Sequence, residues 1–194
     1  MCMVKSRSQR EPRIITREEE AKLVTVLRSI EANQRRSYLK DVADLVEVMA
    51  DTGVRMLEAM QLRYSDVDFE SNLIIIRMSM GNSHRRIPMT TRVATILKRR
   101  QAVDLDKPFN LNEMQIRIAW TWVKEQMGLK DDKGLVLYAL RMTCAYRLIN
   151  DGVDPDMIKL WLGHSQTNST VTKRYAELAR NQLAHTVEMD EPQK

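Results

Sequence analysis

Four side chains, in a fixed order along the chain, could together break a phosphodiester bond. They are Arg55, Arg141, His164 and Tyr175. A guanidinium group binds phosphate through two parallel hydrogen bonds, and an imidazole donates a hydrogen bond to a phosphate oxygen or helps to accept a proton. A phenol has an ordinary pKa of about 10, so it attacks phosphorus well only where neighbouring cations stabilise the phenolate. The four residues therefore predict cleavage of a phosphodiester through a covalent link to tyrosine.

Each of these side chains also has a structural explanation. Arg55 could pair with Glu58 one helical turn further on, and Arg141 could be a solvated charge on an amphipathic helix. His164 could be a structural histidine, and Tyr175 could pack half-buried against the core. The order of the motifs favours catalysis, because four linked motifs seldom arise together by chance.

The sequence around these residues resembles the tyrosine recombinases, the phage integrase family, over residues 13–184. Four segments carry the similarity: Thr52-Gly53-Val54-Arg55-Met56-Leu57-Glu58, Leu140-Arg141-Met142-Thr143, Leu162-Gly163-His164-Ser165 and Lys173-Arg174-Tyr175-Ala176. The resemblance implies that DNA is cleaved through a 3′-phosphotyrosine and rejoined by attack of a free 5′-hydroxyl. It implies neither a cofactor nor a metal, because the bond energy stays in the covalent link.

The resemblance also assigns roles to individual residues and names a partner. Arg55, Tyr138, Arg141, His164 and Tyr175 are the implied catalytic groups, and Glu58 is implied to brace the site. The candidates for DNA contact are His84, Arg85, Arg86, Lys173 and Arg174. Double-stranded DNA is the implied partner. The family assembles on DNA as tetramers, linked here through residues 181–189, and the isolated domain is expected to be a monomer in solution.

The sequence departs from the family pattern at three places. Tyr138 stands where a histidine is usual, three residues before Arg141, and Met80 stands where the hairpin turn usually carries a lysine that acts as general acid. The stretch between His164 and Tyr175 is about two residues longer than expected. Loss of a general acid typically lowers a rate ~10²–10⁴-fold, so we expect a site-specific recombinase with weakened proton transfer.

Three alternatives stay open. The first is a non-catalytic DNA-binding or accessory protein on the same fold, which Met80 and Tyr138 support. A type IB topoisomerase shares the chemistry, although the short chain and the arrangement from His164 to Tyr175 favour a recombinase. A basic helical interaction protein without a DNA function would require the order of all four motifs to be accidental.

The pattern of elements predicts a mainly α-helical catalytic domain with a small antiparallel sheet, an α+β fold. A capping box at Thr16-Arg17-Glu18-Glu19 begins the first helix, and Gly53 is predicted to end a second helix that begins near Ser37. A short helix then carries Arg55. Residues 73–88 are predicted to form a hairpin, with a third short strand near 66–69. Further helices are predicted at about 91–101, 113–127, 139–150, 155–162 and 170–179, the last of which carries Tyr175.

Length and composition agree with a helical domain that binds a polyanion. The 194 residues divide into a flexible basic tail (1–12), the catalytic domain (13–184) and a polar tail (185–194), with a net charge of +5 and a pI of about 9.3. Cys2 and Cys144 are expected to be free thiols, and no signal peptide or membrane span is predicted, so the expected location is the cytoplasm. The N-terminal clamp domain usual in the family does not precede the match. The chain is therefore either a fragment or a naturally short member, and we expect it to bind DNA weakly on its own.

Overall fold

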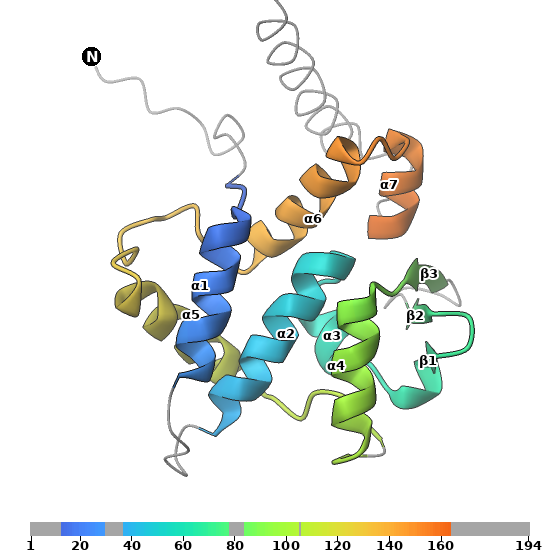
Figure 1. Ribbon diagram of the computed structural model, residues 1–194, viewed down its shortest axis with the longest axis horizontal. Coiled ribbons are helices and arrows are strands. Elements are labelled where there is room, and N and C mark those ends of the chain that lie inside the picture. Colours follow the sequence, from blue (N-terminus) through green and yellow to red (C-terminus); the bar gives the residue numbers. More distant parts are fainter. Residues whose placement is uncertain (1–12, 30–36, 78–83, 105, 164–194) are drawn as a thin grey trace, which may run out of the picture.

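The computed structural model describes residues 13–29, 37–77, 84–104 and 106–163 (Figure 1). Within them the chain forms α1 (Arg17–Arg28), α2 (Tyr38–Thr52), α3 (Met56–Gln61), the 3-10 turn η3 (Tyr64–Asp66), β1 (Val67–Asp68), β2 (Leu73–Arg77), β3 (His84–Pro88), α4 (Thr91–Gln101), α5 (Glu113–Gln126), α6 (Tyr138–Asn150) and α7 (Pro155–Leu162). The prediction of a mainly helical fold with a small antiparallel sheet is confirmed. The helix predicted at 170–179 lies outside the described residues. No described helix has the length and hydropathy needed to cross a membrane.

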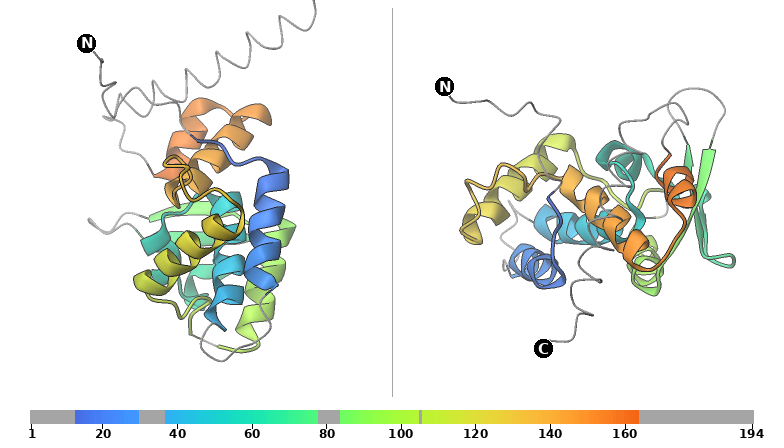
Figure 2. Two further views of the ribbon diagram at one scale, coloured as in Figure 1. Left: turned by 90° about the vertical axis from the view of Figure 1, so that its left-hand side faces the viewer. Right: turned by 90° about the horizontal axis from the view of Figure 1, so that it is seen from above.

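Helix α2 is the centre of the packing. Eleven of its 15 residues are buried, which agrees with a sequence that is apolar on most sides of the helix. It contacts α1, α4, α5 and α6, and Figures 1 and 2 show it enclosed by these helices. The core of the domain therefore lies around α2, and the turns at its end are held from several directions.

Two helix ends that the sequence predicted, the start of α1 and the end of α2, are present in the structure. The Glu19 N–H donates to the Thr16 hydroxyl at 3.1 Å, and the Thr16 N–H donates to the Glu19 carboxylate at 3.1 Å, so the capping box is confirmed. Helix α2 ends at Gly53, which has a φ of 66°. A Cβ at Gly53 would lie 2.5 Å from Cδ2 of Leu162 and 3.2 Å from Sγ of Cys144, so glycine also permits α6 and α7 to approach this turn.

The three strands form one antiparallel sheet in the order β1-β2-β3. The register pairs Ile74 with Ile87 and Ile76 with Arg85. Because side chains alternate along a strand, these four residues share one face of the sheet, and all four are buried. His84 and Arg86 lie on the other face and are exposed. The inner face of the sheet therefore carries one cation, Arg85, among isoleucines.

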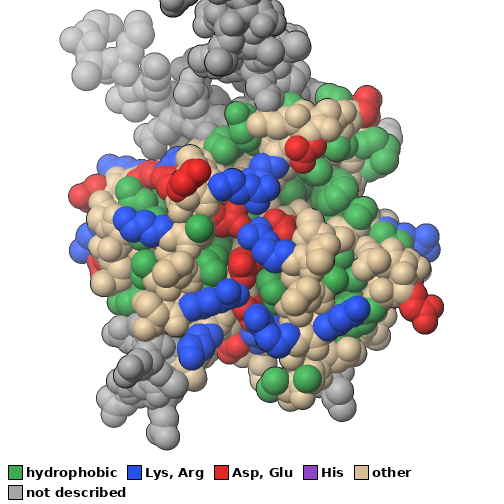
Figure 3. Space-filling view, in the orientation of Figure 1, with side chains coloured by type: hydrophobic (Ala, Val, Ile, Leu, Met, Phe, Trp, Pro, Cys, Tyr) green, Lys and Arg blue, Asp and Glu red, His purple; other side chains and the backbone are tan. Residues whose placement is uncertain are grey.

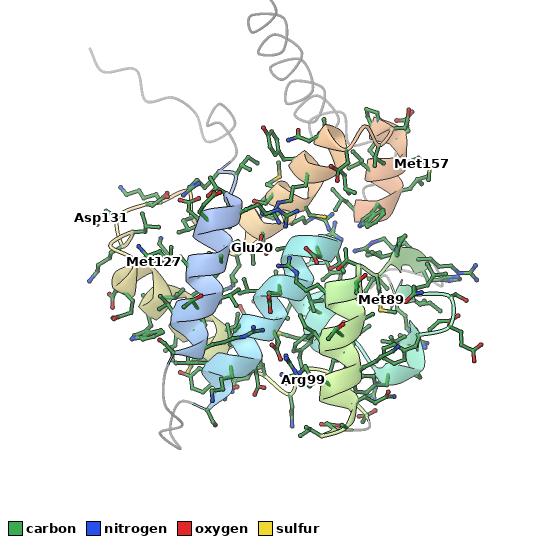
Figure 4. The ribbon with its side chains drawn as sticks, in the orientation of Figure 1. Glu20, Met89, Arg99, Met127, Asp131 and Met157 are labelled. Atoms are coloured by element: carbon green, nitrogen blue, oxygen red, sulfur yellow. The ribbon has the colours of Figure 1, made fainter. Side chains whose placement is uncertain are left out.

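Acidic residues follow one side of α2 and meet arginines from the neighbouring helices. We name Asp41, Asp44, Glu47 and Asp51 the acidic stripe. Its partners are Arg28 of α1 and three arginines of α4: Arg92, Arg99 and Arg100. Glu20 of α1 adds a further carboxylate, within 2.7 Å of Arg92 and 2.6 Å of Arg147. Figure 3 shows these acidic side chains in a seam between basic ones, and Figure 4 shows Glu20 and Arg99 within it. The seam joins α1, α2, α4 and α6 by charge as well as by apolar contact.

Candidate active site

Arg55 lies at the turn between α2 and α3, immediately before the first residue of α3. Its N–H donates to Oε2 of Glu58 and its Nη1 donates to Oε1, both at 2.8 Å, while Nη2 lies 3.4 Å from the carbonyl oxygen of Gly163. The pairing that the sequence offered as a structural explanation is therefore present. It leaves the Arg55 side chain 45% exposed, so Arg55 can also reach a ligand outside the protein.

Arg141 lies in the first turn of α6 and is 1% exposed, so it is not a solvated charge. Its Nη1 donates to the carbonyl oxygen of Gly53 at 2.6 Å, and its Nη2 donates to the carbonyl oxygen of Leu162. Hydrogen bonds to backbone carbonyl groups orient a guanidinium group. Arg141 therefore joins the end of α2 to the end of α7.

Helix α7 is also held against the same turn by a side chain of its own, Trp161. The indole N–H of Trp161 donates to the carbonyl oxygen of Thr52 at 2.9 Å. Gly163 ends the helix with a φ of 66°. Three segments far apart in the sequence, at Gly53, Arg141 and Gly163, thus meet at one place. His164 follows directly on Gly163 but lies outside the described residues, as do Lys173, Arg174, Tyr175 and Met80.

Glu58 connects two arginines. Arg85 of β3 donates from Nη1 to Oε1 at 2.9 Å and from Nη2 to Oε2 at 2.7 Å, and Arg55 donates to the same two oxygens. Burial by itself would raise the pKa of the Glu58 carboxyl, but hydrogen bonds and charge from Arg85 and Arg55 outweigh it and lower the pKa to about 2. Glu58 is therefore ionised at neutral pH, and its predicted role in bracing Arg55 agrees with this geometry.

Of the three hairpin residues predicted to contact DNA, His84 and Arg86 are exposed and Arg85 is buried. Besides Glu58, Arg85 contacts the carbonyl oxygen of Trp161, to which its Nε donates at 2.8 Å. The contacts that Arg85 makes in the structure are thus with protein. Its contact with DNA, like those of His84 and Arg86, stays a prediction.

A cavity of about 770 Å³ opens beside the two predicted catalytic arginines. Tyr138, the first residue of α6, lines it together with Arg55 and Arg141, and its side chain is 47% exposed. The cavity thus brings together three of the five residues predicted to be catalytic. The remaining walls are largely apolar, with contributions from α2, α3, α5 and the segment before α6: Met49, Val54, Met56, Leu57, Trp120, Leu135, Val136 and Leu137.

Three further cations line this cavity, and none of them was predicted from the sequence as a site residue. They are Arg117 and Lys124 of α5, and Lys130 of the loop that follows. None of the described residues that line the cavity is an aspartate or a glutamate. The spacing of Arg117, Thr121 and Lys124 places them on one face of a helix, which was the available signal. Lys130 carries no such signal, because it lies in a loop. A cavity of this composition is suited to an anionic ligand with apolar parts.

Comparison with known proteins gives a consistent result. Residues 13–182 match the sequence pattern of the phage integrase family. The tyrosine recombinase XerA of Pyrococcus furiosus is 26% identical over 187 residues, which cover 91% of this chain and 61% of that protein. The chain spans about half to three-fifths of the length of the first curated relatives that it matches.

Solved structures share the fold. The catalytic domain of bacteriophage HP1 integrase has a TM-score of 0.65 at 22% identity, covering 93% of this chain and 96% of that chain. XerH site-specific recombinase, solved with a palindromic difH substrate as a post-cleavage complex, has a TM-score of 0.71 at 20% identity, covering 92% of this chain and 53% of that chain.

Proposed function

Because the chain belongs to the phage integrase family, we propose that it carries the catalytic part of a site-specific DNA recombinase. The observation that supports this most directly is the cavity that Arg55 and Arg141 both line, together with three further cations. A phosphate that bound there would contact two guanidinium groups whose positions are already fixed by hydrogen bonds. Such preorganised cations favour the charge that develops on phosphate oxygens during displacement.

The proposed reaction proceeds in two displacements at phosphorus. The Tyr175 phenol loses its proton as its oxygen attacks the phosphorus, the bond from phosphorus to the 5′-oxygen breaks, and that oxygen takes up a proton as it leaves. The product is a 3′-phosphotyrosine and a free 5′-hydroxyl. In the second displacement a 5′-hydroxyl loses its proton as it attacks this phosphorus, the bond from phosphorus to the tyrosine oxygen breaks, and the released tyrosine takes up a proton. In the sequence, His164 follows directly on Gly163, whose carbonyl oxygen lies 3.4 Å from Nη2 of Arg55.

Weakened proton transfer is a second part of the proposal. Met80 has no proton to donate to the leaving 5′-oxygen, and Tyr138 offers a neutral phenol where the family has a histidine. We expect cleavage to be slower than in a site with a lysine, while the two arginines still bind the phosphate. A lysine at the Met80 position should raise the cleavage rate by roughly 10²-fold or more, since that is the usual contribution of a general acid.

Double-stranded DNA is the proposed partner, and a tetramer on DNA is the proposed assembly. The XerH structure was solved with a difH DNA substrate, and DNA is carried over to this chain as a proposal. The cations of the cavity and the exposed Arg86 support it, because each phosphate contact adds to affinity and to its dependence on salt. A DNA substrate would place the protein inside the cell, in the bacterial cytoplasm or an infected host.

Covalent trapping on DNA tests the proposal. A nicked duplex carrying a sequence that the protein has selected from a random-sequence pool is incubated with the wild-type chain, and adducts that survive denaturation are counted. We expect an adduct that is lost in Tyr175→Phe and retained in the matched control Tyr146→Phe. An adduct that persists in Tyr175→Phe would contradict the assigned nucleophile.

The alternative function is a non-catalytic DNA-binding or accessory protein on the same fold, and Met80 and Tyr138 favour it. It predicts salt-dependent binding to the duplex without any adduct, in wild type and in Met80→Lys alike. A chain that binds no duplex at any salt concentration would contradict both functions.

A further inference from the structure

Arg85 is a buried cation on a sheet face that is otherwise apolar. It lies opposite Ile76, beside Ile74 and Ile87, and is 8% exposed. Burying a guanidinium group is costly unless hydrogen bonds and an opposite charge compensate it. A cation at this position therefore needs a structural or functional explanation that its exposed neighbour Arg86 does not need.

The contacts of Arg85 join three elements of the fold. Its Nη1 and Nη2 bind both oxygens of Glu58 in α3 at 2.9 Å and 2.7 Å, and its Nε binds the Trp161 carbonyl oxygen in α7 at 2.8 Å. Paired bonds of this kind fix the plane of a carboxylate as well as its position. Arg85 thereby sets where α3 and the last turn of α7 lie relative to the sheet.

Both elements held by Arg85 belong to the candidate active site. The Glu58 oxygens fixed by Arg85 also accept from the N–H and Nη1 of Arg55, so the direction of the Arg55 side chain depends on them. The last turn of α7 ends at Gly163, whose carbonyl oxygen lies 3.4 Å from Nη2 of Arg55.

Arg85 approaches Gly163 more closely than a residue with a Cβ would permit. A Cβ at Gly163 would lie 2.9 Å from Nη1, 3.0 Å from Cδ and 3.1 Å from Cζ of Arg85. A side chain there would displace the guanidinium group, and the φ of 66° also favours glycine. Arg85 and the backbone that leads into His164 are therefore packed directly against each other.

We propose that Arg85 is a positioning residue, which acts through Glu58 and the Trp161 carbonyl group to hold Arg55 and the end of α7 in place for reaction with DNA. This proposal rests on the proposed recombinase function. It assigns Arg85 a role within the protein, whereas Arg86, on the exposed face of the same strand, remains available for phosphate contact.

Three variants separate these roles: Arg85→Gln, Arg85→Lys and the matched control Arg86→Gln, which removes the same charge from the adjacent position of the strand. Amide hydrogen exchange is measured by NMR on each. In Arg85→Gln we expect the amides of Leu162 and Gly163 and those of the first turn of α3 to exchange at least tenfold faster, with α1 and α2 unchanged. Arg86→Gln should leave all of these amides unchanged.

A lysine at position 85 keeps the charge but cannot make all three bonds, so Arg85→Lys should show a smaller increase at the same amides. If Arg85→Gln does not fold, the exchange rates of Arg85→Lys alone test the proposal. Unchanged exchange in Arg85→Lys and Arg85→Gln would overturn the proposal, and so would a uniform increase over all elements in both.

The second arm uses a fluorescein-labelled random-sequence duplex as the probe. Arg86→Gln should lower the affinity and reduce the slope of log K against log salt by about 1, as expected for a lost phosphate contact. Arg85→Gln should leave the slope unchanged, because it removes no phosphate contact, yet slow single-turnover cleavage of the selected nicked duplex at least tenfold. A reduced slope in Arg85→Gln would show that Arg85 itself contacts phosphate and would overturn the proposal.

The two arms distinguish failure of this inference from failure of the proposed function. If the wild-type chain binds no duplex, the recombinase function fails, and with it the functional part of the inference. The exchange arm then still decides whether Arg85 holds α3 and α7. If the wild-type chain cleaves and Arg85→Gln cleaves at the same rate, only the positioning role fails.

Discussion

Replacing Glu58 by glutamine should lower the free energy of unfolding by about 3 kcal/mol at pH 7, and by progressively less as the pH falls. Burial opposes ionisation of this carboxyl, but Arg85 and Arg55 overcome it and hold its pKa at about 2, against an ordinary value of 4.5. A difference of one in pKa corresponds to about 1.4 kcal/mol, which gives about 3 kcal/mol for this gap.

The sign of the effect follows from the direction of the shift. The folded state binds the Glu58 proton more weakly than the unfolded state does, so ionised Glu58 stabilises the fold. This contribution is complete well above pH 4.5 and is lost as the pH falls toward about 2. At pH 3 we expect the difference between wild type and Glu58→Gln to be about 1.5 kcal/mol. At that pH Glu58 is largely protonated in the unfolded state, and so neutral like glutamine, while most of the folded protein still carries the charge.

Urea unfolding of wild type and Glu58→Gln at a series of pH values measures this difference. Other carboxylates titrate in the same range, but they are common to both proteins, so the subtraction isolates Glu58. The matched control is Glu113→Gln, because Glu113 pairs with Arg117 at 2.5 Å and is 47% exposed. An exposed pair of this kind should contribute at most about 1 kcal/mol.

Two results would refute this reasoning. One is a difference between wild type and Glu58→Gln that stays constant from pH 7 to pH 3, since it would mean that the charge of Glu58 does not stabilise the fold. The other is a difference at pH 7 no larger than that of Glu113→Gln. Either result would mean that the arginines around Glu58 do not compensate its burial as the hydrogen bonds indicate.

Gly53, Cys144 and Arg117 are the subjects of three further predictions. Gly53→Ala should lower the free energy of unfolding by at least about 1 kcal/mol, because φ is 66° and the new Cβ would lie 2.5 Å from Leu162; an unchanged urea midpoint would contradict this. In a Cys2→Ser variant, Cys144 should resist a thiol reagent at neutral pH until the protein is unfolded, since burial raises its pKa to about 12; rapid labelling of the native protein would count against it. Arg117→Gln should weaken duplex binding and reduce the salt slope by about 1, and an unchanged slope would exclude Arg117 from phosphate contact.

The local signals of the sequence predicted most of the described fold. The capping box at Thr16 and the stop at Gly53 are present, because both depend on a few adjacent residues. The strand signal at 73–88 also gave the correct pairing of β2 with β3, and the short strand predicted near 66–69 is β1. The helix that carries Tyr175 was predicted from the same kind of signal and lies outside the described residues.

The contacts of the site could be predicted only in part. Side chains alternate between the two faces of the sheet along His84–Pro88, so Arg85 lies on the same face as Ile87. The burial of Arg85 could therefore have been predicted from the sequence, whereas its contact with Glu58 could not. The contacts of Arg141 with the carbonyl groups of Gly53 and Leu162 join residues far apart in the chain. No local propensity specifies such contacts, because they arise from the way α2, α6 and α7 pack together.

The acidic stripe of α2 also gives the two sides of this helix a different distribution of charge. Met49 lines the cavity, and it lies about 200° around the helix from Glu47 and Asp51, so α2 stands between the stripe and the cavity. Carboxylates of the stripe face arginines on one side. On the other side five described cations line the cavity without a lining carboxylate, although Arg55, Arg117 and Lys130 pair with Glu58, Glu113 and Glu125 outside the lining. A molecule polarised in this way is turned by the field of a polyanion before contact, so we expect the cavity to face DNA on approach. The association rate should therefore fall steeply with ionic strength, as electrostatically steered encounters do.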